Sequence, residues 1–135
     1  MEETGIWLDE SGILGASPDG LVEANAVLES KCPFTQRNMT IEEAIYSANF
    51  YLKKDKDGNI VLKKDHAYWH QAQGEMYFSK RDLCYFVVWT TKYIVVIKIS
   101  KDNSWGKNLN ILKQFYFAHI FPKIIEDFHF LWIRS

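Results

Sequence analysis

The sequence is poor in cysteine. Cys32 and Cys84 are its only two, they form no Cys-x-x-Cys pair, and no histidine lies a few residues from either of them, as in a zinc motif. A protein that depends on a disulfide framework or on a structural zinc needs more of these residues. The sequence therefore predicts two reduced cysteines in an intracellular protein.

Long apolar runs are also lacking. The longest, Tyr93 to Ile97, is far shorter than the roughly 20 residues that cross a bilayer. The first four residues, Met-Glu-Glu-Thr, do not resemble the apolar region of a signal peptide. We therefore expect a soluble protein with no membrane contact.

Positive and negative residues are nearly balanced, since the chain has 16 Lys and Arg and 17 Asp and Glu, for a net charge of −1. Balanced charge counts against a passive DNA coat, because such proteins bind phosphates through many basic residues. It counts less against a metal-dependent nuclease, whose site must itself carry carboxylates. With 135 residues, 47% of them hydrophobic, the chain predicts one domain with a packed core over residues 1–135.

Strand and helix patterns alternate along the chain. Strands are expected at residues 6–8, 14–17, 21–23, 26–32, 83–90 and 93–100, with a hairpin over 53–64 that turns at Asp57-Gly58. Helices are expected at residues 40–50 behind the capping box of Thr40, at 66–78 behind Asp65, and from Ser104 onward with a break or kink at Pro122. This order predicts an α/β (α+β) fold with a mixed central sheet flanked by helices.

The residues best suited to chemistry lie in Pro18-Asp19-Gly20 and Glu29-Ser30-Lys31. Two strands joined by a hairpin would place Asp19 beside Glu29, and alternation along the second strand would place Lys31 on the face of Glu29. Two carboxylates and the backbone carbonyl of Ser30 are the oxygen ligands that Mg²⁺ prefers. A lysine beside them can hold a water molecule and offset negative charge during phosphodiester hydrolysis.

A solvated strand face is the alternative for this pattern, because an acidic residue followed later by Glu-x-Lys occurs by chance in many sequences. The neighbouring residues favour a site, since residues 26–32 (Ala-Val-Leu-Glu-Ser-Lys-Cys) are too apolar for an ordinary exposed edge.

Two segments, Gly15-Ala-Ser-Pro-Asp-Gly-Leu21 and Leu28-Glu-Ser-Lys-Cys-Pro-Phe-Thr35, resemble the PD-(D/E)XK nuclease superfamily. Within it, the chain is similar to the YqaJ-like viral recombinase and lambda exonuclease family. The similarity continues through Arg37, the Gln71-Ala-Gln73 helix and the strand at residues 85–90, so it covers nearly the whole chain. It implies a restriction-endonuclease-like core and a Mg²⁺-dependent exonuclease, with Mn²⁺ as a substitute metal, that acts on linear duplex DNA in recombination or replication.

By this resemblance Asp19 and Glu29 match the metal-binding carboxylates, and Lys31 matches the catalytic lysine. Gln71 matches the first glutamine of the family's Gln-x-Gln helix, which faces the active site. Gln73 points elsewhere, because positions two apart lie about 200° around a helix, so a supporting role is expected for it. A packed helix with incidental amides is the alternative.

Three further residues carry weaker expectations. Asp9 resembles an additional acidic position that would support the site, and a turn aspartate before Gly12 is an equal alternative. Arg37 and Ser17 are expected to contact DNA. Arg37 could bind a phosphate through two parallel hydrogen bonds, and an ordinary surface arginine is the alternative.

Other charged and aromatic residues favour ordinary roles. His66 and His70 are spaced as a zinc pair can be, but without a third ligand two helix histidines are the better interpretation. Lysines on both arms of the 53–64 hairpin could follow a DNA backbone, but neighbouring aspartates dilute their charge. The aromatic residues at 115–121 favour a place in the core or in an interface.

The chain departs from the family at its start. Relatives carry helices before the Asp19 region, including a glutamate for a second metal, whereas here only eighteen residues precede Asp19, and Glu2 and Glu3 lie in a different setting. We therefore expect a fragment or a shortened relative. The alternative function is a catalytically weak nucleic-acid-binding remnant of the fold. A single-strand annealing protein and a homo-oligomer are the partners that the resemblance implies.

Overall fold

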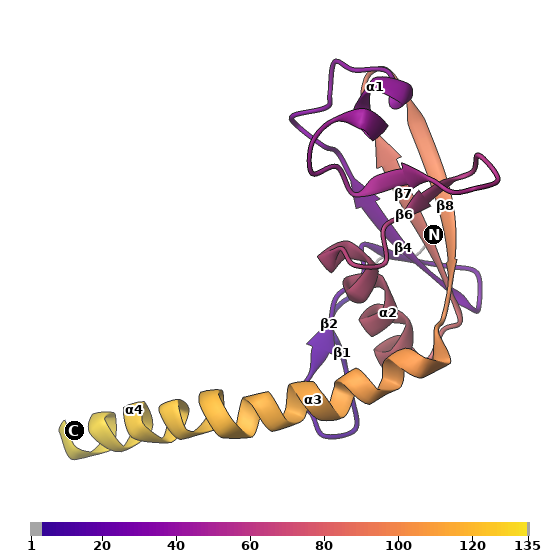
Figure 1. The fold of residues 1–135 in the computed structure, drawn as a ribbon. Helices are drawn as coiled ribbons and strands as arrows, with labels where there is room; N and C mark the ends of the chain where they lie inside the picture. Colours follow the sequence, from indigo (N-terminus) through magenta and orange to yellow (C-terminus); the bar gives the residue numbers. More distant parts are fainter. Residues whose placement is uncertain (1–3, 135) are drawn as a thin grey trace.

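Four strands form the central sheet of the computed structural model, which describes the backbone of residues 4–134 and the side chains of residues 4–127. The expectations on Glu2 and Glu3 lie outside these residues. In spatial order the strands are β3 (Gly20–Val22), β4 (Ala26–Lys31), β7 (Leu83–Trp89) and β8 (Ile94–Ser100). The central pair is parallel and both outer pairs are antiparallel, so the predicted mixed sheet is confirmed (Figure 1).

Two short hairpins flank this sheet. They are β1 (Trp7–Leu8) with β2 (Gly15–Ala16), and β5 (Leu52–Lys54) with β6 (Ile60–Leu62). The predicted turn at Asp57-Gly58 is confirmed: Gly58 has φ +81°, and the Asp55 carboxylate accepts from the backbone N–H groups of Asp57 and Asn59. A positive φ here suits glycine, which has no Cβ to clash.

Residues 18–20 connect two strands that do not pair with each other. They do not turn the chain between two paired strands, because β2 pairs with β1 and β3 pairs with β4. Asp19 lies in a bend that links the β1–β2 hairpin to the β3–β4 hairpin. The bend leaves Asp19 at the start of β3, where the β3–β4 pairing can act on it.

The helices are α1 (Ile41–Tyr46), α2 (Ala67–Ser79), the 3₁₀ helix η1 (Asn103–Gly106), α3 (Lys107–Phe115), the π-helix η2 (Tyr116–Ile120) and α4 (Phe121–Arg134). The capping box of Thr40 and Glu43 is confirmed. The helix behind it is shorter than predicted, because Ser47 has an extended backbone and its hydroxyl donates to the carbonyl of Ala44 at 2.7 Å.

The predicted starts of α2 and of the C-terminal helix are off by one and by three residues. The cap of α2 is His66, whose Nδ1 accepts from the N–H of Tyr68, and not Asp65. The C-terminal helix begins at Lys107, after a 3₁₀ turn in which the Asp102 carboxylate accepts from the N–H of Ser104. Each cap side chain satisfies an N–H group that has no partner within the helix.

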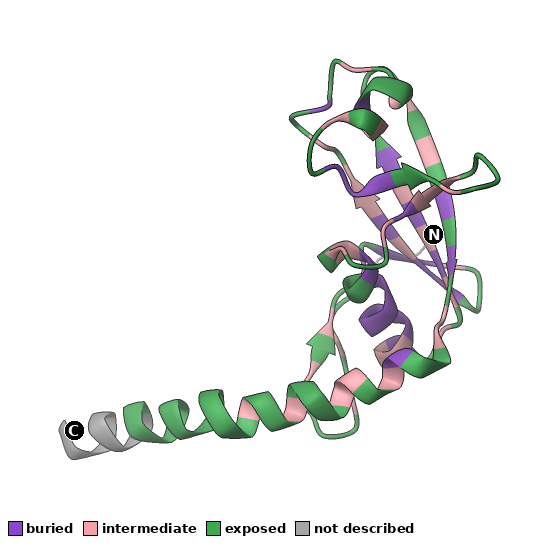
Figure 2. Ribbon diagram, in the orientation of Figure 1, coloured by how far each residue is buried: buried purple, intermediate pink, exposed green. Residues whose placement is uncertain are grey.

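The predicted break at Pro122 is wrong, because α3, η2 and α4 follow one another without a gap, and the predicted kink stays a prediction. Proline lacks an N–H and crowds the preceding turn, and the wider π-turn η2 lies directly before it. Figure 1 shows α3, η2 and α4 as one long arm that extends away from the sheet, and Figure 2 shows most of that arm exposed. Phe115, Phe117 and Phe121 are 55%, 53% and 39% exposed, so a place in the core is wrong for them, and a place in an interface stays a prediction.

The core lies between the sheet and α2. Val27, Phe86 and Ile97 are neighbours across β4, β7 and β8 on one sheet face, and Ala72 and Met76 come from the buried side of α2. The β1–β2 hairpin contacts α2 as well (Figure 1). α2 is therefore buried on more than one side. In the part of the chain that the structure describes, no helix has the length and apolarity needed to cross a membrane.

Truncation of Phe86 tests this core. Phe86 is fully buried, so Phe86→Ala removes about 3–5 kcal/mol from the free energy of unfolding. Phe117→Ala, on the exposed arm, changes it by less than about 0.5 kcal/mol. Urea unfolding followed by circular dichroism measures both. Equal losses in the two variants would contradict the assigned core.

Candidate active site

The β3–β4 hairpin brings Asp19 beside Glu29. Gly20 pairs with Leu28 in its register. The backbone N–H of Asp19 donates to the carbonyl of Leu28 at 3.0 Å and contacts Glu29 Oε1 at 3.2 Å. In return, the N–H of Ser30 donates to Asp19 Oδ2 at 2.8 Å. The backbone N–H of Asp19 thus holds the Glu29 carboxylate, and the N–H of Ser30, next to Glu29, holds the Asp19 carboxylate.

Lys31 lies on the same face of β4 as Glu29, as alternation along the strand predicts. Its Nζ is 3.4 Å from Glu29 Oε2 and donates to Gln71 Oε1 at 3.3 Å. It also lies 4.3 Å from the centre of the Tyr68 ring. The ammonium group is therefore fixed by an anion, an amide and an aromatic face.

Gln71 joins α2 to the two strand residues. Its Nε2 donates to Glu29 Oε2 at 3.3 Å, while its Oε1 accepts from Lys31. The structure thus brings together Asp19, Glu29, Lys31 and Gln71, from the β3–β4 hairpin and α2. Their catalytic roles stay predictions.

Glu75 is a residue of this site that the sequence interpretation missed. It is 1% exposed, and its Oε1 accepts from Gln71 Nε2 at 3.2 Å. Burial and the neighbouring Glu29 carboxyl raise the pKa of Glu75 to about 9. The available signal was spacing, because Tyr68, Gln71 and Glu75 fall at i, i+3 and i+7 on one helix face.

Gln73 points away from Glu29, in agreement with the helix geometry. Its Nε2 donates to the carbonyl of Ser100 at 3.1 Å, and its Oε1 accepts from the N–H of Asp102 at 2.8 Å. Tyr77, one helical turn later, donates from its hydroxyl to the carbonyl of Asp102 at 2.7 Å. Gln73 and Tyr77 therefore hold α2 against the end of β8. Gln73 contacts neither Asp19 nor Glu29 and stabilises the position of the helix instead.

Asp9 lies in the β1–β2 turn and pairs with α3. Its Oδ2 is 3.0 Å from Lys113 Nζ, and its Oδ1 accepts from the Ser11 hydroxyl at 2.7 Å and, more weakly, from the N–H of Leu14. Burial alone would raise the pKa of Asp9, but the hydrogen bonds from Ser11 and Lys113 outweigh it and lower the pKa to about 2. These contacts fit the turn aspartate that was the alternative interpretation.

The remaining predicted residues have local partners. Arg37 donates to the carbonyl of Phe34 at 2.6 Å, and its guanidinium lies 3.7 Å from the centre of the exposed Phe34 ring. Ser17 contacts the carbonyl of Gly5 at 3.4 Å, and the Ser30 hydroxyl accepts from Trp89 Nε1 at 3.0 Å. The predicted DNA contacts of Arg37 and Ser17, and the metal contact of the Ser30 carbonyl, stay predictions.

The two helix histidines have structural partners. His66 caps α2, and His70 Nδ1 accepts from Trp105 Nε1 at 3.0 Å. Over the residues with described side chains, no group of three or more His, Cys, Asp or Glu residues could hold a metal ion. The predicted metal role of Asp19 and Glu29 stays a prediction.

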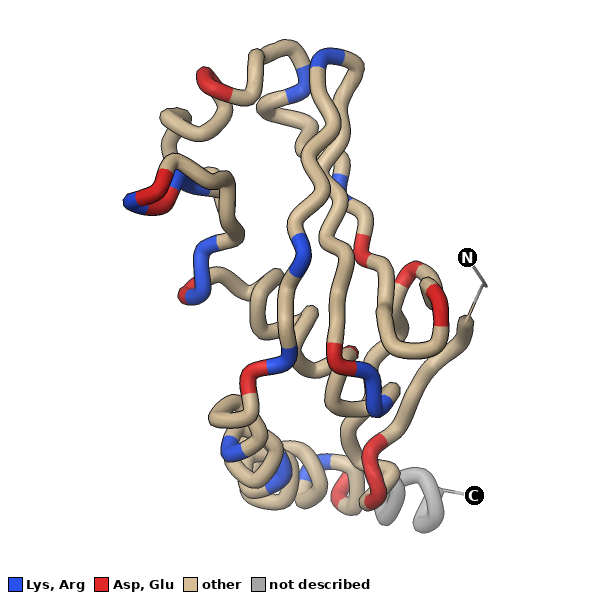
Figure 3. The backbone as a smooth tube through the Cα atoms, turned by 90° about the vertical axis from the view of Figure 1, so that its right-hand side faces the viewer, with Lys and Arg blue, Asp and Glu red and all other residues tan. Residues whose placement is uncertain are grey.

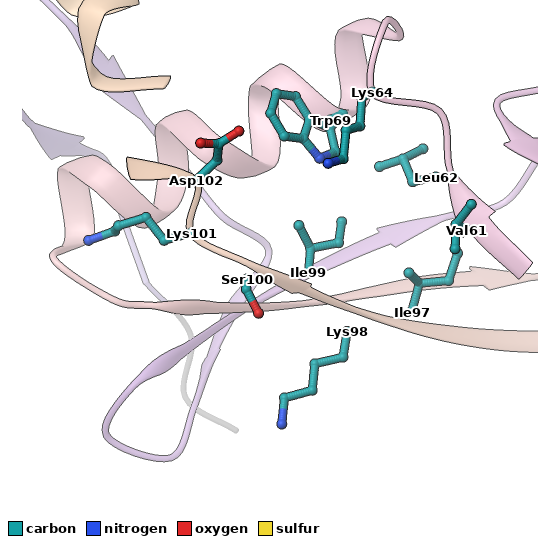
Figure 4. Close-up of a pocket in the computed structure, with 10 residues that line it drawn as sticks. All are labelled: Val61, Leu62, Lys64, Trp69, Ile97, Lys98, Ile99, Ser100, Lys101 and Asp102. Carbon is teal, nitrogen blue, oxygen red and sulfur yellow. The ribbon is translucent and has the colours of Figure 1, made fainter. Parts of the chain in front are cut away.

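Charge and cavity shape do not single out another site. Figure 3 shows Lys and Arg interspersed with Asp and Glu along the chain, including at the tip of the β5–β6 hairpin. A pocket of about 350 Å³ lies between β6, α2 and β8 (Figure 4). Trp69 lines it together with Lys64 and Lys98, but no residue of the carboxylate site does.

Comparison with solved structures identifies the fold. LHK-Exo, an alkaline exonuclease from Laribacter hongkongensis, matches in two crystal structures at 22% identity, with TM-scores of 0.68 for its complex with dAMP and 0.64 for the other. The matches cover 99% and 98% of this chain. The chain has the restriction-endonuclease-like fold. No protein-family model and no curated protein sequence matches it.

The match is partial in length. This chain spans 63% of the LHK-Exo chain in both structures. The shared fold therefore covers nearly all of this chain but only part of the LHK-Exo chain.

The Asp9 carboxylate, held by the Ser11 hydroxyl and by Lys113, gives a pH-dependent contribution to stability. Because the folded pKa of Asp9 is lowered from 3.8 to about 2, the contribution is present above pH 3.8 and is lost as the pH falls toward 2. Solvent screening limits it to about 1 kcal/mol. Asp9→Asn should therefore destabilise the protein at pH 6 and be nearly neutral near pH 2.

Urea unfolding of parent and variant at both pH values measures this difference. Asp57→Asn, at the exposed tip of the β5–β6 hairpin, is the matched control and should show little effect at either pH. A loss in Asp9→Asn that is equal at both pH values would contradict the ion pair.

Proposed function

We propose that this chain is the catalytic core of a Mg²⁺-dependent deoxyribonuclease that hydrolyses phosphodiester bonds as an exonuclease on linear duplex DNA. One observation carries the proposal: the β3–β4 hairpin and α2 bring Asp19, Glu29, Lys31 and Gln71 into one connected set of hydrogen bonds and an ion pair. A restriction-endonuclease-like fold shared with an alkaline exonuclease supports the same reaction class.

The donor set fits a hard divalent cation. Asp19 is exposed and Glu29 lies beside it, so both offer carboxylate oxygens, and the Ser30 carbonyl would be a third oxygen. Mg²⁺ favours such ligands and retains several waters, which suits a site with few protein ligands. Mn²⁺ accepts the same ligands. When bound, the cation supplies Lewis-acid polarisation of the phosphate and a more acidic water.

Lys31 is suited to stabilise charge on a reacting phosphate. Glu29 and Gln71 hold its ammonium in place, and the Tyr68 ring covers one side of it. A positive charge that is already oriented costs no reorganisation when negative charge develops on the phosphate oxygens. Gln71 contributes a neutral carbonyl, so it positions Lys31 without adding a second anion to neutralise its charge.

DNA binding has to come from local groups, because the net charge of the chain is −1. The loop after β4 carries Arg37, exposed and stacked on Phe34, which can meet a phosphate close to the strand that holds Glu29 and Lys31. The second candidate function, DNA binding without useful turnover, is favoured by one observation: among the described side chains, no three His, Cys, Asp or Glu residues gather as a metal site.

Digestion of end-labelled linear duplex DNA with Mg²⁺ tests the nuclease proposal. The parent should release nucleotides, and Glu29→Gln and Lys31→Met should each lower the rate by about 10²-fold or more, because each removes a charge from the reacting centre. Lys98→Met and Glu126→Gln are matched controls. Lys98 is exposed and pairs with Tyr85 on the opposite sheet face, and Glu126 is exposed on α4, so both should keep the parental rate.

A parent that binds the duplex but never cleaves it would support the remnant instead. Equal cleavage of covalently closed circular DNA would overturn the exonuclease assignment while keeping a nuclease.

Titration calorimetry with Mg²⁺ tests the metal ligands without turnover. Asp19→Asn should weaken binding at least about tenfold, since a neutral amide replaces a carboxylate ligand. Asp55→Asn, on the distant β5–β6 hairpin, should bind as the parent does. Unchanged affinity in Asp19→Asn would remove Asp19 from the ligand set.

A further inference from the structure

Glu75 is a buried carboxyl group at the proposed site that the function above does not use. It lies on α2, one turn after Gln71, with Ala72 and Met76 beside it on the buried side of the helix. Its Oε1 accepts from Gln71 Nε2 at 3.2 Å. Its Oε2 is buried and accepts from no donor among the described residues, and its other neighbour is the Glu29 carboxyl.

A carboxyl group in this position is costly for the fold. Moving a polar group from water into the interior destabilises the folded state unless its hydrogen bonds are replaced. An apolar residue, like the neighbouring Ala72 and Met76, would fill the same space without that cost. A glutamate at position 75 is therefore explained by its polar neighbours. These are Gln71 and Glu29, and both belong to the proposed site.

The contact with Gln71 determines which way the Gln71 amide faces. Gln71 is exposed, and an exposed glutamine has three rotatable bonds and two chemically different amide ends. Carboxyl oxygens of Glu29 and Glu75 both accept from its Nε2, which leaves Oε1 for the ammonium of Lys31. Glu75 thus supplies the second acceptor that holds the amide in one orientation.

We propose that Glu75 is a positioning residue that orients the Gln71 amide and, through it, Glu29 and Lys31. The inference rests on the proposed function, because the aligned groups are those assigned to the metal and the phosphate. Glu75 itself is not among the groups assigned to the substrate or the cation. Its loss should therefore affect metal binding and turnover more than DNA binding.

Two substitutions of similar size separate orientation from packing. Glu75→Leu removes every hydrogen bond of the side chain. In Glu75→Gln, the amide oxygen can still accept from Gln71 and the amide nitrogen can donate to Glu29. We expect Glu75→Leu to weaken Mg²⁺ binding in calorimetry about tenfold and to lower kcat about tenfold, with KM for duplex DNA unchanged. Glu75→Gln should stay within about threefold of the parent in all three quantities.

Parental metal affinity and kcat in Glu75→Leu would overturn the inference. A loss in Glu75→Gln as large as that in Glu75→Leu would also overturn it, because charge and not orientation would then be the property that matters.

A measurement on the parent alone keeps the inference testable if Glu75→Leu does not fold. Heteronuclear NMR relaxation reports the mobility of each glutamine side-chain amide. The amide of Gln71 should be as rigid as the backbone, and that of Gln114, exposed on α3 with no described hydrogen bond, should be mobile. Equal mobility of the two amides would overturn the inference.

This measurement also separates the two proposals. A parent that binds no Mg²⁺ and cleaves no DNA, yet shows a rigid Gln71 amide, would contradict the proposed function and leave the Glu75 contact in place. A parent that binds Mg²⁺ and cleaves DNA with a mobile Gln71 amide would contradict only the role of Glu75.

Discussion

The burial of Glu29 is the constraint on which the rest of this site depends. Glu29 is 2% exposed and lies in β4 on the sheet face that packs against α2, where its neighbours Val27 and Phe86 are apolar. A carboxylate in that place destabilises the fold unless it is paired and hydrogen-bonded. The N–H of Asp19, the ammonium of Lys31 and the amide of Gln71 meet this need from the β3–β4 hairpin and α2. The contacts that make Glu29 tolerable in the core are the same ones that gather the groups suited to phosphate chemistry.

Local sequence signals predicted much of the fold because they act within a few residues. The capping box at Thr40, the Asp57-Gly58 turn and the strong alternation of β7 and β8 all depend on near neighbours. The end of α1 was less predictable, because the Ser47 hydroxyl competes for the carbonyl of Ala44 that a longer helix would use. The continuous arm through Pro122 was also missed, since a π-turn can accommodate a proline that ordinary helix geometry cannot.

The site could be predicted where a short hairpin or a helical period fixes the geometry. Register follows from the β3–β4 hairpin and places Asp19 opposite Glu29, and helical period separates Gln71 from Gln73. Glu75 was missed because its importance arises only when α2 packs on β4, which no local pattern reveals. The pairing of Asp9 with Lys113 likewise joins residues that are distant in the sequence and meet only in the folded chain.

The most direct test of a metal site at the β3–β4 hairpin is crystallographic. Crystals of the protein soaked in Mn²⁺ would be measured for anomalous scattering, and the difference map would be searched over the whole molecule. We expect one strong peak in contact with the carboxylates of both Asp19 and Glu29, and its loss in crystals of Glu29→Gln. A map with no peak at these carboxylates, or with its strongest peak at His66 and His70, would contradict the site.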